Sequence, residues 1–198
     1  MASHDRDRRL IRRIARGDRA AFEELYHRYY RRLFGYVFKV TRRQELVDEV
    51  LDDTLLAVWQ GAGSYGGRSR VSTWIFGIAY RKSLKALARL PRERATAPSS
   101  PETEAPDPDE LPAPPEGPES LRERRDLASV LGRALAQLSP EQRTVVELTY
   151  AHGCSYPEIA EIVGCPVNTV KTRMFHARRR LRELLPKLGI TDGRVGSR

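Results

Sequence analysis

The side chains best suited to chemistry in this sequence lie in one basic segment near the C-terminus, at residues 167–185. Its first turns offer side chains that can hydrogen-bond to the edges of DNA bases: Asn168, Thr169, Thr172 and Arg173. Groups that can bind backbone phosphates surround them: Lys171, His176, Arg178 and Arg179. The pattern predicts that the start of this segment reads bases and that its cations hold the DNA backbone.

Helical signals place these side chains on a helix-turn-helix spanning roughly Ser155 to Leu185. A capping box at Ser155 and Glu158 predicts a short helix, and Gly164 predicts the turn that follows it. Earlier in the chain, Ser139 and Gln142, with Pro140 at the first helical position, form another capping box and predict the start of another helix. From Val167 onward, apolar residues recur on a stripe about 100° wide, with the polar and basic residues opposite. A short helix, a glycine turn and a longer basic amphipathic helix form the arrangement that enters a major groove.

Catalytic and metal-dependent functions find little support in the sequence. No nucleophile accompanies His176, so we interpret that residue as a phosphate donor. Cys154 and Cys165 should lie at opposite ends of a short helix, too far apart for a disulfide, and they lack paired metal-ligand spacing. With no phosphate-binding loop either, we expect no enzyme activity, no metal or other cofactor, and no small-molecule substrate.

Charge and proline content divide the chain into distinct parts. Residues 1–90 carry 19 basic and 10 acidic side chains, and residues 121–198 carry 14 and 8. Between them, residues 91–120 carry 2 basic and 8 acidic side chains and nine of the 13 prolines. We therefore predict an all-α chain with two small helical domains, 1–90 and 121–186. A flexible acidic linker, 91–120, would join them, and a flexible tail, 187–198, would follow.

The front domain contains an expected helix with an acidic side, at residues 44–60. Four carboxylates share that side, two pairs of them at i,i+4: Asp48, Glu49, Asp52 and Asp53. Like charges at that spacing are mildly destabilising, and no lysine or arginine within the helix relieves them. The acidic face is explained either as a docking site for a basic partner or as a plain solvated surface.

A basic loop and a half-basic helix follow. The loop, Gly61 to Arg70, leads into a helix expected from Ser72, whose stripe is apolar over its first two turns, around Trp74 and Ile78, and basic afterwards. Phe76 is expected roughly opposite this stripe. The cations of the two elements suit a phosphate backbone, although a solvated face is the alternative: Arg68, Arg70, Arg81, Lys82, Lys85 and Arg89. Near the start of the chain, Asp18 is placed to cap a helix whose many aromatic residues, Phe22, Tyr26 and Tyr29 among them, are interpreted as core rather than as a platform for bases.

These segments resemble a known family, the extracytoplasmic-function (ECF) RNA polymerase sigma factors. GDRAAFEELYHRYYRRLFGYV, DEVLDDTLLAVWQ and STWIFGIAYRKSLKALAR are similar to sigma region 2, and LSPEQRTVVELTYAHGCSYPEIAEIVGCPVNTVKTRMFHARRRLREL is similar to region 4. The resemblance covers about four-fifths of the chain, in the right order. It leaves no room for a region 3 domain, which this group lacks.

The resemblance implies an initiation subunit with three kinds of partner: core RNA polymerase, promoter DNA and an anti-sigma factor. The four carboxylates would dock on the polymerase clamp helices. The 61–70 loop and the helix to Arg89 would bind and melt the −10 element, and the C-terminal helix would read the double-stranded −35 element. The linker would thread the RNA exit path. Many members carry Asn and Asp where this chain has Arg81 and Lys85, so we expect more phosphate contact and less base reading there.

A second hypothesis is a one-component transcriptional regulator that is not a polymerase subunit. It is disfavoured because the front domain shows no signature of a sensing pocket and because the acidic helix would have no role.

Residues 4–16 have no apolar stretch typical of a secretory signal, and no segment approaches the ~20 apolar residues that span a bilayer. We therefore expect a cytoplasmic protein without membrane insertion.

Overall fold

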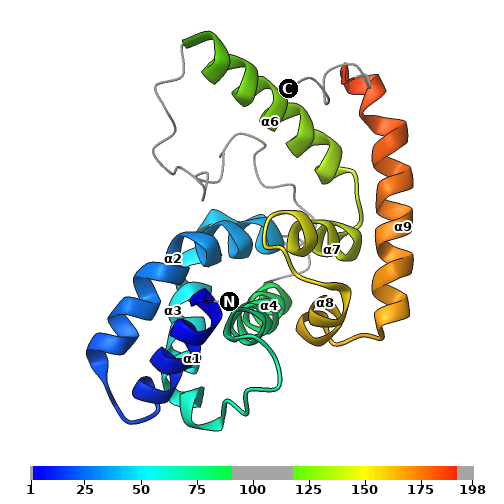
Figure 1. Cartoon of the computed structure of the whole chain (residues 1–198). Coiled ribbons are helices and arrows are strands. Elements are labelled where there is room, and N and C mark those ends of the chain that lie inside the picture. Colours follow the sequence, from blue (N-terminus) through cyan, green and yellow to red (C-terminus); the bar gives the residue numbers. More distant parts are fainter. Residues whose placement is uncertain (1, 91–117, 191–198) are drawn as a thin grey trace. The chain divides into compact units, whose positions relative to one another are not determined.

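The computed structural model describes residues 2–90 and 118–190, and every regular element there is helical (Figure 1). The chain divides into two compact units, so the predicted all-α fold with two helical domains is confirmed. Side chains are described for 4–90 and 127–190. Most of the predicted linker and of the predicted tail falls outside the described residues.

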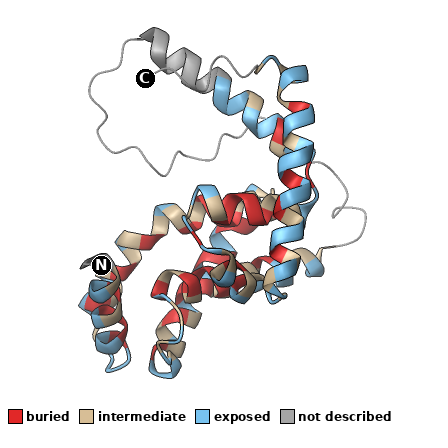
Figure 2. Cartoon of the chain, turned by 45° about the vertical axis from the view of Figure 1, so that its right-hand side comes forward, coloured by how far each residue is buried: buried red, intermediate tan, exposed pale blue. Residues whose placement is uncertain are grey.

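The N-terminal unit contains four α-helices and a short 3-10 turn. They are α1 (Ala2–Ile14), α2 (Arg19–Thr41), α3 (Gln44–Gly61), η1 (Ala62–Ser64) and α4 (Val71–Arg89). Helices α2, α3 and α4 pack on one another, and α1 packs on α2. Buried positions recur along each of these helices (Figure 2). The largest fully buried side chains are Tyr36, Phe76, Ile11, Leu25, Leu33, Leu51 and Ile75.

Helix α4 differs from its expected pattern. Its buried line runs through Ile75 and Phe76 and continues along the small residues Ala79, Ser83 and Ala86. Phe76, predicted to lie opposite the core stripe, is fully buried, whereas Trp74 and Ile78 are only partly buried. Small residues let α4 pack along most of its length, so its cations flank the buried line rather than continue it. The predicted position of the apolar stripe is therefore wrong, whereas Arg81, Lys85 and Arg89 are exposed on the second half as expected.

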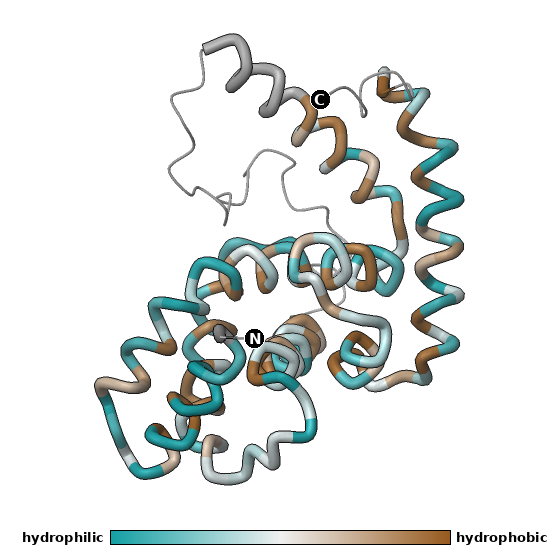
Figure 3. The backbone as a smooth tube through the Cα atoms, in the orientation of Figure 1, coloured by the Kyte–Doolittle hydropathy of each residue, from teal (hydrophilic) through white to brown (hydrophobic). Residues whose placement is uncertain are grey.

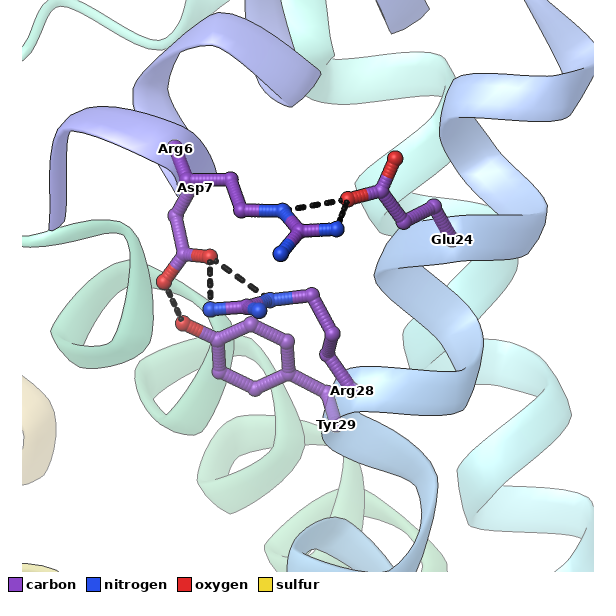
Figure 4. Close-up of polar contacts among 5 residues, drawn as sticks. All are labelled: Arg6, Asp7, Glu24, Arg28 and Tyr29. Carbon is purple, nitrogen blue, oxygen red and sulfur yellow. Dashed lines mark hydrogen bonds and ion pairs between the residues drawn. The ribbon is translucent and has the colours of Figure 1, made fainter. Parts of the chain in front are cut away.

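Helix α1, which the sequence patterns did not indicate, is fastened to α2 by a charged network (Figure 4). Asp7 is only 6% exposed and accepts hydrogen bonds from Arg28 Nε at 3.0 Å and Tyr29 Oη at 2.7 Å. Burial, and then the bond to Asp7, raises the pKa of Tyr29 well above its ordinary value. A second, exposed ion pair joins Arg6 to Glu24 at 2.6 Å. The N-terminal segment is thus an integral part of the unit.

Helix α2 begins at the predicted cap. The Asp18 carboxylate accepts a hydrogen bond from the Ala21 backbone amide at 3.0 Å and another from Arg13 Nε at 2.8 Å. The bond from Ala21, and then that from Arg13, lowers the pKa of Asp18 below its usual value. A carboxylate anchored in this way stabilises the fold only while it is ionised.

This cap makes stability depend on pH in a defined direction. Because the pKa of Asp18 is lower in the folded state, its contribution is present above the unfolded pKa of about 4 and is lost as the pH falls through the folded value. Asp18→Asn keeps a capping oxygen without the charge, so its stability should fall less steeply than that of the wild type below about pH 4. Denaturant unfolding followed by tryptophan fluorescence tests this, since Trp59 and Trp74, the chain's 2 tryptophans, both lie in the N-terminal unit. Identical pH profiles would contradict it.

The C-terminal unit is built around α6 (Pro118–Ala136), α7 (Pro140–Tyr150) and α9 (Val167–Leu184), with η2 (Pro186–Leu188) after α9. Helix α8 (Tyr156–Val163) precedes α9 in the chain, and its residues up to Ala160 belong to this unit. The predicted capping box at Ser139 is complete, and the carboxylate half of the one predicted at Ser155 is present. Ser139 and Gln142 bond reciprocally at the start of α7, and Glu158 accepts from the amide and hydroxyl of Ser155 before α8. The predicted turn between α8 and α9 is also present, with Gly164 at φ +71°, a conformation that favours glycine.

Candidate nucleic-acid interface

Helix α9 carries the groove-binding candidates on the side away from its buried line. Val170, Met174 and Ala177 are buried, and apolar and hydrophilic positions alternate along the helix (Figure 3). At 100° per residue, one face gathers Asn168, Thr172, Phe175 and Arg179 within about 60°. All four of these residues are exposed. Lys171, His176 and Arg178 are exposed on its flanks.

Two of the predicted base readers lie at the edge of this face. Thr169 and Arg173 are half-buried, on the side of the helix nearer its buried line. Arg173 Nη1 lies 3.7 Å from Cys165 Sγ. The pKa of Glu141 on α7 is lowered chiefly by hydrogen bonds, and the charge of Arg173 contributes. On the central face, the Thr172 hydroxyl donates to the Asn168 carbonyl at 3.0 Å, which leaves the hydroxyl oxygen as an acceptor.

Phe175 was not among the predicted site residues, and it lies in the centre of the exposed face. Its side chain is 63% exposed, and its ring meets His176 edge-on with centroids 5.4 Å apart. Large aromatic side chains normally gain free energy by burial, so an exposed one within a polar face suggests a contact made in a complex. In a major groove, an aromatic side chain can contact the methyl group of thymine. A phenylalanine opposite the apolar stripe was the sequence signal that could have identified it.

Tyr150, which was also not among the predicted site residues, positions Arg178, a residue predicted to bind a phosphate. Tyr150, at the end of α7, is 64% exposed, and its hydroxyl oxygen accepts a hydrogen bond from Arg178 Nε at 3.1 Å. The Arg178 guanidinium carbon also lies 5.8 Å from the centre of the tyrosine ring. These contacts restrict the Arg178 side chain before any ligand binds, which reduces the entropy it loses on binding.

In the N-terminal unit, the acidic side of α3 separates into two edges. The edge toward α4 is neutralised within the molecule, because Lys82 Nζ lies 3.1 Å from Asp53 Oδ2 and Arg89 pairs with Glu49. The charge relief that the helix itself lacks therefore comes from α4. Such partly exposed pairs contribute little stability, at most about 1 kcal/mol.

The other edge of α3 faces α2. Within the described part of the chain, Asp48 and Asp52 make no ion pair, and both are exposed. Burial, and then the nearby charges of Tyr26, Asp48 and Asp52, raises the pKa of Tyr30. Tyr30 itself stacks with Tyr26 at a centroid distance of 5.0 Å. The unneutralised acidic edge is thus bordered by half-exposed aromatic rings, which the sequence pattern assigns to the core.

The residues predicted to bind the −10 element differ in whether another helix already engages their side chains. Lys82 and Arg89 are engaged by α3, whereas Arg68, Arg81 and Lys85 are exposed and make no ion pair with the described residues. Arg70, the residue that precedes α4, is exposed.

Both cysteines are free, Cys154 buried and Cys165 half-buried. No helix in the described ranges is long and apolar enough to cross a membrane.

Comparisons with known proteins agree with this two-unit geometry. Residues 25–93 match the family model for Sigma-70 region 2, and residues 129–181 match that for Sigma-70, region 4. The ECF RNA polymerase sigma factor SigM of Mycobacterium tuberculosis strain H37Rv is 32% identical over 183 residues, which cover 92% of this chain and 86% of SigM. The sigma-H factor of Pseudomonas aeruginosa is 27% identical over 95% of this chain and 98% of its own length.

A solved structure gives the same result for the fold. The sigma factor RpoE of Bartonella quintana, crystallised with the anti-sigma factor NepR, is 25% identical with a TM-score of 0.62, over 83% of this chain and 96% of that one. The two matched regions define a sigma-70-type transcription initiation factor. The chain belongs to the ECF RNA polymerase sigma factors. It therefore acts as an RNA polymerase sigma factor, directing the core enzyme to promoters.

Proposed function

We propose that the two units divide promoter recognition between them. Helix α9 reads the −35 element with its central face, and the exposed cations of the 65–70 loop and α4 hold the −10 element. The carrying observation is the face of α9, where Asn168, Thr172 and Phe175 are exposed together above a buried apolar line. Hydrogen-bonding groups and an aromatic ring on one face can read base edges and a thymine methyl at once.

Core polymerase would bind α3. The support is electrostatic, because Asp48 and Asp52 form an exposed acidic edge with no cation paired to it among the described residues. A basic helix of the polymerase would neutralise these charges and relieve their mutual repulsion at i,i+4. Glu49 and Asp53 would join this contact by leaving their partners on α4, Arg89 and Lys82.

Run-off transcription tests the function directly. Purified chain and core polymerase are incubated with promoter fragments that the full chain has selected from a random library. We expect transcripts of defined length that require both proteins. A chain that binds DNA but neither binds core polymerase nor starts transcription would instead be a one-component regulator.

Regulation and location follow from the same assignment. Since RpoE of B. quintana was crystallised with an anti-sigma factor, we infer that this chain is held inactive by a protein of that kind and works in the cytoplasm. It would act as an adaptor, leaving catalysis to the polymerase.

The role of Phe175 has a specific test. If its ring contacts a thymine methyl, replacing that thymine by uracil removes the contact and should cost about 1 kcal/mol, near the value of one buried methyl group. In the Phe175→Ala variant the same replacement should cost nothing. Fluorescence anisotropy with duplexes carrying uracil at each thymine of the selected −35 site measures both. A methyl preference that survives in Phe175→Ala at every position would exclude the contact.

A further inference from the structure

A cleft of about 440 Å³ opens in the N-terminal unit between α1 and the loop after η1. Helix α1 packs against η1, which brings the two sides together. Three arginines one turn apart, Arg8, Arg12 and Arg16, line the helical side. The loop side contains Gly63, Tyr65, Gly66 and Gly67. The loop side lies within the 61–70 segment predicted to bind the −10 element, whereas no residue of α1 belongs to a predicted DNA-binding set.

Arg8 fixes the loop and retains an unused donor. Its Nη2 donates to the Gly67 carbonyl at 2.9 Å, at a backbone position with φ +68°. Its Nε is buried and has no hydrogen-bond acceptor among the described residues. A buried guanidinium nitrogen without an acceptor is unfavourable. An anion in the cleft would supply one.

The other two cleft arginines contrast with their neighbours on α1. Arg6 pairs with Glu24 and Arg13 with Asp18, on other faces of the helix. Arg12 and Arg16 are exposed, and no carboxylate of the described chain pairs with either. Like charges at i,i+4 repel. The cleft therefore concentrates positive charge that the protein itself does not neutralise.

The loop side suits close approach by a ligand backbone. A Cβ added at Gly63 or Gly66 would meet no atom within 4 Å, so there is open space at both glycines. Tyr65 adds an aromatic ring beside the cations, held by the bond from its hydroxyl to the Ser69 carbonyl at 2.5 Å. Cations along a groove with an aromatic ring beside them are typical of single-stranded nucleic-acid sites. Arg68, a few residues further on, extends the positive charge beyond the cleft.

We propose that this cleft binds a backbone phosphate of the opened promoter strand. The guanidinium groups of Arg12 and Arg16 hold the phosphate, and Arg8 ties the loop to α1 so that the site is preformed. The inference rests on the proposed function, because it adds α1 to the surface that binds the melted −10 strand. Free phosphate compounds share this chemistry, so the test separates the two sources.

The experiment compares two variants with equal change in net charge. Arg12→Gln/Arg16→Gln removes two of the three cleft cations and keeps Arg8, and Arg9→Gln/Arg31→Gln removes two exposed arginines outside the cleft. Binding of the full chain to a fluorescein-labelled 12-nucleotide oligo(dT) is measured by anisotropy from low to moderate KCl. A second arm measures displacement of the oligonucleotide by pyrophosphate.

The cleft variant should bind roughly tenfold more weakly at low salt, and the slope of log K against log[KCl] should fall by about 0.7 for each phosphate that the variant no longer neutralises. The control variant should keep the wild-type slope. Equal losses of affinity in the two variants would overturn the site, because they would show only a general charge effect. Pyrophosphate binding that depends on Arg12 and Arg16, with oligonucleotide binding unaffected by them, would overturn the assignment to a DNA strand.

The inference and the proposed function fail separately. If the wild-type chain gave no run-off transcript while the cleft variant still bound the oligonucleotide more weakly than the control, the proposed function would fall and the phosphate site would stand. If run-off transcription were normal while the two variants lost affinity equally, the proposed function would stand and the phosphate site would fall. Tryptophan fluorescence of each variant shows whether the N-terminal unit is folded.

Discussion

Replacing both Asp52 and Asp53 by lysine should abolish binding to core RNA polymerase. The change replaces two carboxylates of α3 by two cations, and like charges placed opposite a basic partner cost several kcal/mol. Affinity should therefore fall at least 100-fold, which corresponds to about 2.7 kcal/mol. Anisotropy of the fluorescently labelled chain, titrated with core polymerase, measures the loss, and run-off transcription should disappear with it.

The DNA affinity of the same variant provides the control. Helix α9 belongs to the other compact unit, so binding of the double mutant to a −35 duplex should equal that of the wild type. Wild-type tryptophan fluorescence would show that the N-terminal unit remains folded. Simultaneous loss of polymerase and duplex binding in a folded protein would contradict the division of roles between the units.

The single variants separate the two edges of α3. Asp53 already shares its charge with Lys82, whereas Asp52 makes no ion pair with the described residues. Asp52→Lys should therefore weaken polymerase binding more than Asp53→Lys. Equal effects would indicate that leaving Lys82 costs Asp53 little, so that both carboxylates contribute equally to the contact.

Features specified by neighbouring residues could be predicted from the sequence. The cap at Asp18, the box at Ser139 and Gln142, the bond from the Ser155 amide to the Glu158 carboxylate, and the turn at Gly164 are all present. Each depends on contacts within about one helical turn, where residue type and spacing determine the geometry. The buried and exposed faces of α9 could also be predicted, because a strong apolar stripe fixes the orientation of a helix.

Contacts between distant residues were not accessible in this way. Lys82 and Asp53 are 29 positions apart, and no pattern within either helix indicates their ion pair. Among the described side chains of helix α1, only Leu10, Ile11 and Ile14 are buried and apolar, too few for a strong periodic signal among many charges. On α4, alanine and serine proved to form the buried line because close helix packing favours small side chains, which hydropathy alone does not reveal.

The largest stability effect is expected at Asp7, the residue that joins α1 to α2. Asp7→Ala removes the acceptor for Arg28 and for the Tyr29 hydroxyl, which would then be buried without a partner. Hydrogen bonds to charged groups contribute roughly 1.5–3 kcal/mol, and a buried partner left unpaired adds its desolvation penalty. We therefore expect the N-terminal unit to lose about 2–3 kcal/mol of its free energy of unfolding.

Urea unfolding of the full chain, followed by fluorescence of Trp59 and Trp74, reports on that unit alone. Asp5→Ala is the matched control, since Asp5 is exposed on the same helix and should cost less than about 0.5 kcal/mol. Asp7→Asn keeps an acceptor oxygen for Tyr29 but loses the charge opposite Arg28, so its loss should be intermediate. If Asp7→Ala unfolded at the same urea concentration as Asp5→Ala, the network would add no net stability and α1 would be held by its apolar side chains alone.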